Sequence, residues 1–265
     1  MEINLFRDNP NARYAVISDI HSNYAALNAV LEDISSINAD GIICLGDIVG
    51  YGPDPESCTR QIKEKTLFSV MGNHDYIVLY FPAGVNRVAK QAAEWTKKRM
   101  LPRFYNFPFK AANWKYLKNL PKEVVSGDWM FVHGSPRDPL SEYVHMEKAE
   151  YGEGLDSIKD LFTIFSKVCF VGHTHIPGIL DSFMTYHTPA DIDMKYTFED
   201  DNKVIVNVGS VGFPRDKDPR PCYAVVDAQG IEFRRVEYPM EETAKKIENI
   251  SSLDNRLIER LKTGK

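Results

Sequence analysis

Five short segments of the sequence carry side chains that bind metal ions or move protons. They read Asp-Ile-His at 19–21, Gly-Asp-Ile-Val-Gly at 46–50, Gly-Asn-His-Asp at 72–75, His-Gly at 133–134 and Gly-His-Thr-His at 172–175. Together they hold five of the seven histidines. Imidazole and oxygen ligands suit Mn²⁺, Fe or Zn²⁺ better than Ca²⁺, and no cysteine belongs to the set. The segments therefore predict a site for divalent metal ions.

The number of candidate ligands favours two ions over one. A single tetrahedral Zn²⁺ needs only about four ligands. Two divalent ions roughly 3.5–4 Å apart that share a carboxylate would use the set better. Such a pair polarises a phosphoryl group and supplies a bridging hydroxide for in-line attack. The chemistry predicted from the residues is therefore metal-assisted hydrolysis of a phosphoester.

Each of these segments directly follows an apolar run that we expect to form a buried strand. Helical periodicity at 25–37 and a polar helix at 56–65 separate the first three runs, which predicts a parallel sheet with right-handed crossovers. Ligands of such sheets gather at the carboxyl ends of the strands, so the segments should converge there. The five expected strands are 14–17, 41–45, 67–71, 129–132 and 168–171.

The remaining sequence predicts one domain over residues 1–265 without a linker. A further strand is expected at 204–208, and the runs 223–226 and 231–236 flank a turn and predict a closing hairpin. Apolar residues at steps of three and four predict an amphipathic helix at 240–262. Packing of this helix on its own domain is favoured over a dimer interface, so we expect a monomer or a weak homodimer.

Residues 81–119 form an expected helical insert with unusual charge. The insert holds nine Lys/Arg against one acid, giving +8, so the rest of a chain whose net charge is −5 carries −13. It also holds eight aromatic residues. Two interpretations of the insert are open. We favour a solvated charged face that covers a small aromatic core over a lid that attracts an anionic substrate. Nucleic-acid bases could stack on these aromatic residues, and a nuclease is therefore the alternative function.

The composition excludes several classes of protein. With 32 Lys+Arg against 37 Asp+Glu, the chain is too acidic for a dedicated nucleic-acid binder. No apolar run approaches the roughly 18 residues of a membrane span, and no secretory signal is visible. The four cysteines are far apart and form no Cys-x-x-Cys pair. A cytoplasmic location is the expectation.

The ordered set DIH, GDIVG, GNHD, VHG and GHTH, within residues 13–226, resembles the five motifs of the calcineurin-like metallophosphoesterase superfamily. The resemblance implies an α/β fold, a four-layer α/β/β/α sandwich, around a dinuclear metal site. It implies that Asp19, His21 and His175 hold one ion, that Asn73, His133 and His173 hold the other, and that Asp47 bridges them. Mn²⁺ is the first expectation, with Fe, Zn²⁺ or Ni²⁺ as alternatives.

By the same resemblance His74 is a catalytic residue and not a metal ligand. It would donate a proton to the leaving oxygen or stabilise the charged transition state, with Asp75 as a supporting partner that does not itself bind metal. Protein Ser/Thr phosphatases continue their second motif as Gly-Asp-x-Val-Asp-Arg-Gly, whereas this chain reads GDIVGYGPDP. The missing Asp-Arg pair speaks against a phosphoprotein substrate.

GDIVGYGPDP, HGSPRDPL and NVGSVGFPRD instead resemble a prokaryotic group of phosphoesterases described as diadenosine-tetraphosphatase-like. The expected function is therefore a phosphoesterase that acts on a phosphorylated small molecule or a nucleotide, with monoester or diester preference open. Arg137 and Arg215, both in Pro-Arg-Asp contexts, are either phosphate-binding residues or structural loop ions. A nuclease, and less so a scaffold that keeps the fold without activity, remain the alternatives.

Overall fold

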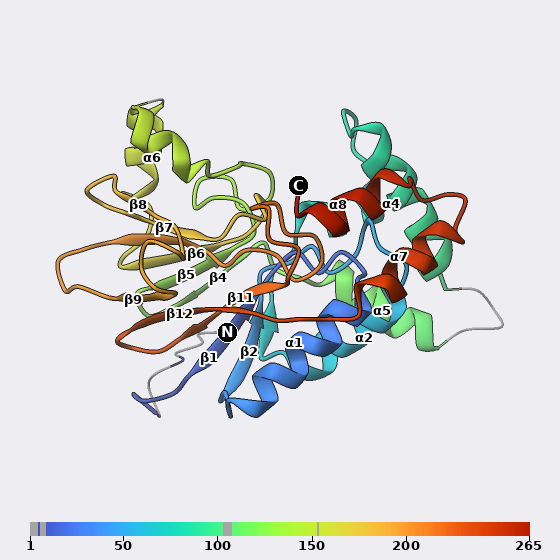
Figure 1. Cartoon of the computed structure of the whole chain (residues 1–265), viewed down its shortest axis with the longest axis horizontal. Coiled ribbons are helices and arrows are strands. Elements are labelled where there is room, and N and C mark those ends of the chain that lie inside the picture. The colour runs from blue at the N-terminus through green and yellow to red at the C-terminus, as the bar shows by residue number, and fades with distance from the viewer. Residues whose placement is uncertain (1–4, 6–8, 103–107, 153) are drawn as a thin grey trace.

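The computed structural model describes residues 5, 9–102, 108–152 and 154–265. Two six-stranded sheets face each other (Figure 1). The first sheet has the order β3 (Phe68–Ser69), β2 (Gly41–Cys44), β1 (Tyr14–Ile17), β11 (Cys222–Val226), β12 (Gly230–Arg235), β9 (Lys195–Thr197). The second has the order β4 (Glu123–Ser126), β5 (Trp129–Val132), β6 (Val168–Val171), β10 (Val204–Asn207), β7 (Gly178–Asp181), β8 (Tyr186–His187).

Helices cover the outer faces of both sheets. Next to the first sheet lie α1 (Tyr24–Ser36) and α2 (Pro55–Lys65), and three residues separate the end of β3 from α3 (Asn73–Tyr80). The second sheet is covered by the 3₁₀ helix η2 (Met146–Tyr151) and by α6 (Leu155–Leu161). Figure 1 shows α1 and α6 on opposite sides of the molecule. The four-layer α/β/β/α arrangement implied by the resemblance is therefore confirmed.

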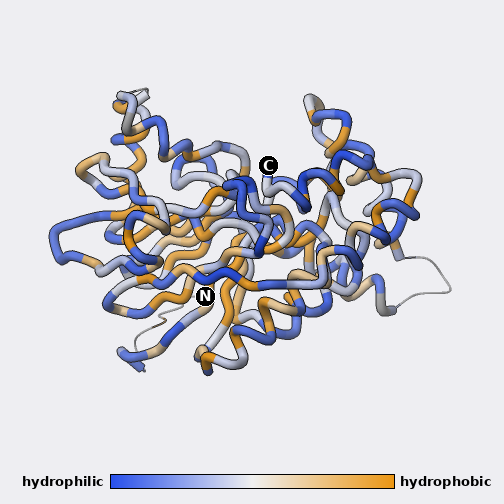
Figure 2. The backbone as a smooth tube through the Cα atoms, viewed as in Figure 1, coloured by the Kyte–Doolittle hydropathy of each residue, from blue (hydrophilic) through white to orange (hydrophobic). Residues whose placement is uncertain are grey.

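Alternation of side chains along the strands explains the layers. In β1, Ala15 and Ile17 pack against α1 while Tyr14 and Val16 face the second sheet. In β6, Phe170 faces the first sheet and Cys169 faces the helices of the second. Because successive strand residues point to opposite faces, a strand buried on both sides must be apolar throughout. Figure 2 shows these strands as hydrophobic segments inside a largely hydrophilic outer layer.

The sheet topology confirms two predictions from the sequence. Strands β1, β2 and β3 pair in parallel, with Val16 opposite Ile43 and Ile43 opposite Phe68. Strands β11 and β12 form the expected antiparallel hairpin, with Val226 opposite Ile231. The carboxyl ends of β1, β2, β5 and β6 consequently carry the polar segments that follow them.

The prediction of one continuous helix at 240–262 is wrong. The structure has two helices, α7 (Met240–Glu248) and α8 (Arg256–Thr263). Between them lie Asn and Ser residues and Asp254, whose carboxylate accepts a hydrogen bond from the Arg256 amide at 2.9 Å. Such side chains compete for backbone hydrogen bonds and end helices. Both helices bury apolar residues against their own chain: Ile247, Leu257 and Leu261.

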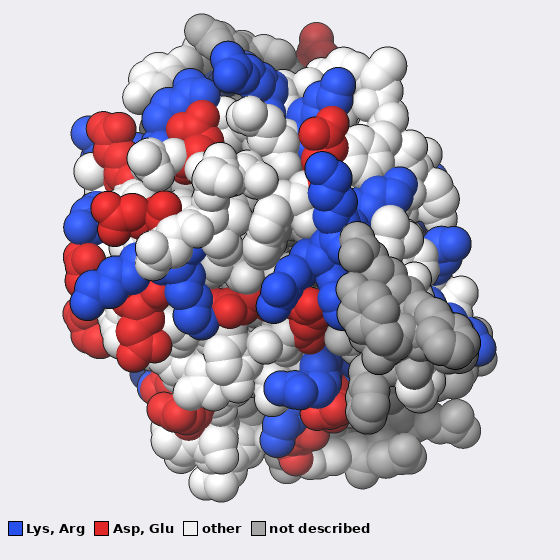
Figure 3. All heavy atoms as spheres, turned by 90° about the vertical axis from the view of Figure 1, so that its right-hand side faces the viewer, with Lys and Arg blue, Asp and Glu red and all other residues white. Residues whose placement is uncertain are grey.

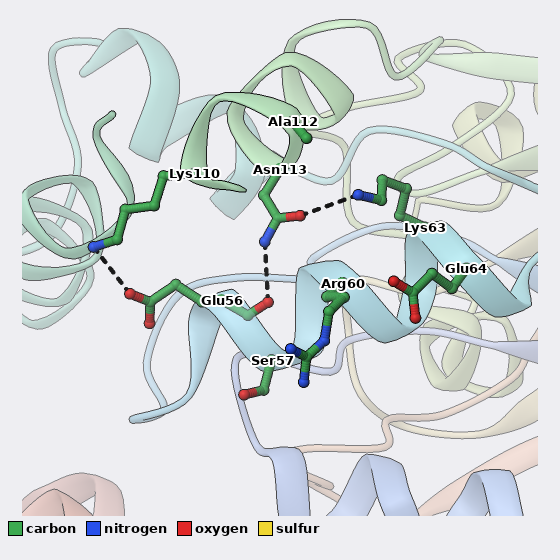
Figure 4. Close-up of a pocket in the computed structure, with 8 residues that line it drawn as sticks. All are labelled: Glu56, Ser57, Arg60, Lys63, Glu64, Lys110, Ala112 and Asn113. Carbon is green, nitrogen blue, oxygen red and sulfur yellow. Dashed lines mark hydrogen bonds and ion pairs between the residues drawn. The ribbon is translucent and has the colours of Figure 1, made fainter. Parts of the chain in front are cut away.

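The 81–119 segment contains α4 (Arg87–Met100) and α5 (Phe109–Lys118). The start of α5 is joined to α2, because Lys110 Nζ lies 3.1 Å from the Glu56 carboxylate and Asn113 donates to the Glu56 carbonyl at 3.2 Å (Figure 4). Arg99 of α4 also contacts Glu56, at 3.0 Å. On the face in Figure 3, Lys and Arg side chains are interspersed with Asp and Glu where residues are coloured.

In the described part of the chain, no helix has both the length and the apolar character needed to cross a membrane.

Candidate metal centre

The loops that follow the strands hold an unusual backbone conformation. Asp19, His21, Asp47, His173 and His175 all have positive φ values, between +47° and +66°. Positive φ is uncommon for residues other than glycine and costs free energy that surrounding structure must supply. These five residues are among the seven candidate ligands. The left-handed turns direct their side chains into one buried centre between the ends of the two sheets.

Asp19, His21 and His175, hereafter the first cluster, lie together with almost no solvent exposure. The Asp19 Oδ1 atom is 3.2 Å from His175 Nε2 and 3.7 Å from His21 Nε2. The two Nε2 atoms are 3.1 Å apart. Residues from the β1 and β6 loops thus offer one oxygen and two nitrogens to a common point.

Asn73, His133 and His173, hereafter the second cluster, form a similar group on the other side of Asp47. The His133 Nε2 atom lies 3.0 Å from Asn73 Oδ1 and 3.2 Å from His173 Nδ1. These residues come from the amino terminus of α3 and from the loops after β5 and β6. The second cluster also offers one oxygen and two nitrogens.

Asp47 lies between the two clusters. Its Oδ2 atom is 3.4 Å from His21 Nε2 and 3.4 Å from His133 Nε2. Its Oδ1 atom accepts a hydrogen bond from the His74 amide at 2.7 Å. One carboxylate oxygen therefore faces both clusters while the other is fixed by the backbone, which is the placement that a bridging ligand needs.

The residues fit divalent cations because two buried acceptor atoms lack hydrogen-bond partners. Asp19 Oδ1 and Asp47 Oδ2 are both buried and unpartnered in the structure. A buried carboxylate oxygen without a partner costs several kcal/mol, on the order of the desolvation of an ion, unless a cation is present. Burial raises the pKa of both carboxyls, but interactions with the surrounding histidines outweigh it and hold the pKa of each below its ordinary value. Both side chains are therefore expected to be ionised at neutral pH.

Backbone carbonyls orient three of the imidazoles. The Nδ1 atom of His133 donates to the Leu45 carbonyl at 2.9 Å, and Nε2 of His173 donates to the Ser141 carbonyl at 3.2 Å. Likewise His175 Nδ1 donates to the Phe213 carbonyl. Each acceptor fixes the proton on the outer nitrogen and leaves the lone pair of the other nitrogen facing the cluster, as metal-binding histidines require.

Electrostatics support the same arrangement. Burial lowers the pKa of His173 to about 3 and that of His175 to about 4, so both rings are neutral and able to ligate. For His133, burial lowers the pKa, but the Asp47 carboxylate outweighs it and raises the pKa to about 9. The Asp47 carboxylate therefore stabilises a positive charge at the position of the second cluster.

His74 lies beside the centre and borders a pocket of about 370 Å³. Its ring centroid is 4.3 Å from that of Tyr51 and 4.7 Å from that of His21. A Cβ atom at Gly50, where φ is +107°, would lie 2.7 Å from His74 Nδ1, so only glycine fits against this ring. Ligand atoms of His21, Asp47 and His74 also lie within 4.8 Å of one another. His74 is thus close enough to act on a group bound beside His21 and Asp47.

Asp75 has a different contact from the one expected. Its carboxylate accepts hydrogen bonds from the Val49 amide at 3.1 Å and from the Gly72 amide at 3.0 Å. It therefore joins the loop that carries Asp47 to the loop that carries Asn73 and His74, and it does not contact the His74 ring. The His74 Nδ1 atom is buried without a hydrogen-bond partner.

The two arginines considered from the sequence differ in their surroundings. Arg137 pairs with Glu142, and its Nη2 donates to Ser157 Oγ at 2.9 Å. This is the contact of a structural loop residue. Arg215 instead lies near the centre: its amide donates to the His175 carbonyl at 3.1 Å, and its charge helps to lower the pKa of His175 after burial.

Two aromatic residues of the site were missed by the sequence analysis. Tyr51 follows directly after the GDIVG motif, so its place in the loop was a usable signal. Tyr143 stacks on His173 with ring centroids 3.7 Å apart and is 46% exposed. It lies in a segment without any motif, and only the fold of the 134–145 loop brings it to the second cluster.

The insert contributes to the pocket through uncharged residues. Among the described residues of 81–119, the pocket is lined by Pro82, Ala83, Gly84, Val85, Asn86 and Ala89. Arg99 and Lys110 of the insert instead pair with Glu56. The insert therefore borders the pocket, but none of its described Lys or Arg residues lines it.

Comparisons with known proteins agree with this geometry. The family model of the calcineurin-like phosphoesterases matches residues 12–177. An uncharacterized protein from Methanocaldococcus jannaschii is 38% identical over 248 residues, which cover 88% of this chain and 90% of that protein. The crystal structure of a metallophosphoesterase from Sphaerobacter thermophilus is 35% identical, with a TM-score of 0.79 over 96% of this chain and 100% of that one. A hypothetical protein from Pyrococcus horikoshii, 21% identical, shares the fold with a TM-score of 0.71 over 96% of this chain and 99% of its own.

Proposed function

The chain belongs to the calcineurin-like phosphoesterase family and is a metal-dependent phosphoesterase, and on that premise we propose that it uses two divalent ions to hydrolyse a small phosphorylated molecule or a nucleotide. The observation that carries the proposal is the pair of buried, unpartnered oxygens of Asp19 and Asp47, which face histidine nitrogens from both clusters. The pocket beside them, about 370 Å³, suits a small ligand.

We assign one ion to the first cluster, one to the second, and the bridging position to Asp47. When bound, the two ions supply Lewis-acid activation of the phosphoryl group and of the attacking water. Neutral His173 and His175 would offer the lone pairs of their inner nitrogens to the ions, because the carbonyls of Ser141 and Phe213 hold the ring protons on the outer nitrogens. The oxygen and imidazole donors make Mn²⁺ our first choice, with Fe, Zn²⁺ or Ni²⁺ as alternatives.

His74 is the catalytic residue in this proposal. Its ring borders the pocket, next to the clusters, where a leaving oxygen would depart. It donates a proton to that oxygen or stabilises the charge that develops there. Arg215 binds a phosphate oxygen in this proposal, since it lies beside His175 and its guanidinium forms no ion pair with an acid among the described residues.

We also propose that the enzyme works in the cytoplasm. The four cysteines, Cys44, Cys58, Cys169 and Cys222, are free and buried. Unpaired cysteines are typical of a reducing compartment.

The test is hydrolysis of p-nitrophenyl phosphate and of bis-p-nitrophenyl phosphate by purified protein with Mn²⁺. We expect turnover of at least one, its loss on addition of EDTA, and its return when Mn²⁺ is restored. His187→Asn is the matched control, because His187 pairs with Asp181 on β7, away from both clusters, and should keep full activity. The absence of turnover with every divalent ion tried would overturn the proposal.

A further inference from the structure

Two arginines near the metal centre have no acidic partner in the part of the chain that the structure describes. Arg215 lies in the loop after β10 and Arg260 lies on α8. Both are half-buried, and neither guanidinium forms an ion pair with a described carboxylate. By contrast, the neighbouring Arg256 and Arg220 are each paired with an aspartate. Partly desolvated cations without a counter-charge favour an anionic ligand.

Tyr51 connects these arginines to the catalytic residue. The Arg260 guanidinium carbon lies 5.9 Å from the centroid of the Tyr51 ring. The same ring contacts His74, at 4.3 Å, and His21, at 4.7 Å. Burial raises the pKa of the Tyr51 phenol, and the charges of Arg215 and Arg260 both act against that rise. The two cations therefore lie close to the same phenol, one ring away from His74.

The position of α8 is fixed by contacts with the loop that carries Arg215. Leu257 and Leu261 of α8 are buried in the same apolar group as Tyr51 and Phe213. The Lys217 amide donates to the Gly264 carbonyl at 2.8 Å. Because the Phe213 carbonyl also accepts the His175 proton, this loop joins α8 to the first cluster. Figure 1 shows α8 next to α4 at this end of the molecule. Arg260 thus lies on a helix that packs against the Arg215 loop, and it contacts Tyr51, which lines the pocket.

We propose that Arg260, together with Arg215, forms a second anion subsite that binds a phosphate group adjacent to the scissile phosphate. This inference rests on the proposed function and extends it. The subsite makes the enzyme selective for substrates with neighbouring phosphate groups, such as a nucleoside diphosphate, over simple monophosphates. Guanidinium groups bind phosphate through paired hydrogen bonds, which gives the selectivity its physical basis. The matched family segment ends at residue 177, so α8 lies outside it.

The test is a binding measurement on the Mn²⁺-loaded protein by isothermal titration calorimetry. The probes are methylenediphosphonate, which carries two adjacent non-hydrolysable phosphonates, and methylphosphonate, which carries one. We expect the wild type to prefer the diphosphonate and Arg260→Ala to reduce that preference roughly tenfold or more, the loss of a charged hydrogen bond. Arg260→Lys should keep part of the preference, because it retains the charge without the paired donors.

Arg256→Ala is the matched control, since it removes one positive charge from the same helix at a residue paired with Asp254. It should leave the preference unchanged. Arg260→Gln provides a second neutral variant of similar length, and the melting temperature of each variant verifies folding. An equal loss of affinity for both probes in Arg260→Ala, or no loss for either, overturns the subsite. So does a wild type without preference for the diphosphonate.

These outcomes are separate from those of the proposed function. Hydrolysis of p-nitrophenyl phosphate tests the reaction, whereas the calorimetry tests the subsite without turnover. A protein that hydrolyses the ester but shows an Arg260-independent preference refutes the subsite alone. A protein that fails to hydrolyse the ester but shows an Arg260-dependent preference supports the subsite and refutes the proposed reaction.

Discussion

The two clusters of the metal centre offer the same set of donors but differ in their access to solvent. In the first cluster, Asp19, His21 and His175 are at most about 2% exposed. In the second, Asn73 is half-buried and borders the pocket together with His173. The difference indicates that solvent reaches the second cluster more readily than the first.

The loops that hold the histidines of the two clusters also differ in burial, and the loop of the second cluster is the more exposed. His175 of the first cluster is held by the Phe213 carbonyl, in a loop that packs on α8. His173 of the second is held by the carbonyl of Ser141, an exposed residue, and is covered by the partly exposed Tyr143 ring. Fewer buried contacts around a loop mean a lower cost of local opening. The second cluster should therefore exchange its ion more readily.

The largest effect is expected where the two clusters meet. Asp47→Asn removes the bridging charge from both, so we expect activity to fall more than about 100-fold and metal content to decrease. Elemental analysis by ICP mass spectrometry on dialysed protein measures the ions. Asp191→Asn, at an exposed loop position, is the control. Retention of both ions by Asp47→Asn would contradict the bridging assignment.

A change at His74 should separate chemistry from ion binding. We expect His74→Asn to lower kcat on the order of 10²–10⁴-fold, the usual contribution of a general acid, while both clusters keep their ions. Steady-state kinetics and ICP on the same sample test this. Because a ligand atom of His74 lies within reach of His21 and Asp47, loss of an ion in this variant would instead make His74 a ligand.

The difference in exposure itself can be tested by metal removal. On mixing the Mn²⁺-loaded protein with excess chelator, we expect release in two phases, the faster from the second cluster. Asn73→Ala should accelerate the fast phase about tenfold, by loss of one ligand, and leave the slow phase unchanged. Asp19→Asn should accelerate the slow phase. Release in a single phase from the wild type would show that the clusters do not differ in this way.

The smallest effect is expected at Arg137, which supports the loop of the second cluster only. Arg137→Ala removes the contact with Glu142, so we expect ion affinity at the second cluster to fall less than about tenfold and KM to change little. Arg215→Ala, by contrast, should raise KM. A large increase in KM for Arg137→Ala would assign it to substrate binding instead.

The contact between Arg137 and Glu142 should also make the stability of the fold depend on pH. The hydrogen bond from Arg137 holds the pKa of Glu142 below its ordinary value. A group with a lowered pKa in the folded state stabilises the fold above its unfolded pKa, and that contribution is lost as the pH falls through the folded value. We therefore expect the difference in melting temperature between wild type and Arg137→Ala to be present at neutral pH and to disappear below about pH 4.

The sequence predicted the strands and the candidate ligands because both leave local signals. Runs such as 14–17 and 168–171 are apolar throughout, since each strand is buried on both faces. The polar residues that interrupt these runs mark the carboxyl ends of the strands. The motif resemblance then provided the assignment of each ligand to a cluster.

Other features depend on contacts between distant segments and had no local signal. The positive φ of His173 and His175 is imposed by the surrounding loops and is not a preference of histidine. Tyr143 reaches His173 only because the 134–145 loop folds back over it. The break between α7 and α8 was missed because the apolar spacing continues through Ile250 and Leu253 across the turn.

The unpartnered oxygens of Asp19 and Asp47 have a consequence for folding as well as for catalysis. Cations that bind only the folded chain add RT ln(1 + [M]/Kd) to its stability, about 2.7 kcal/mol when the free ion is at 100 times its Kd. The unfolded chain scatters these ligands over more than 150 residues and offers no comparable site. Metal supply would then determine how much of this protein persists in its folded form, so that starvation for the ion lowers its abundance together with its activity.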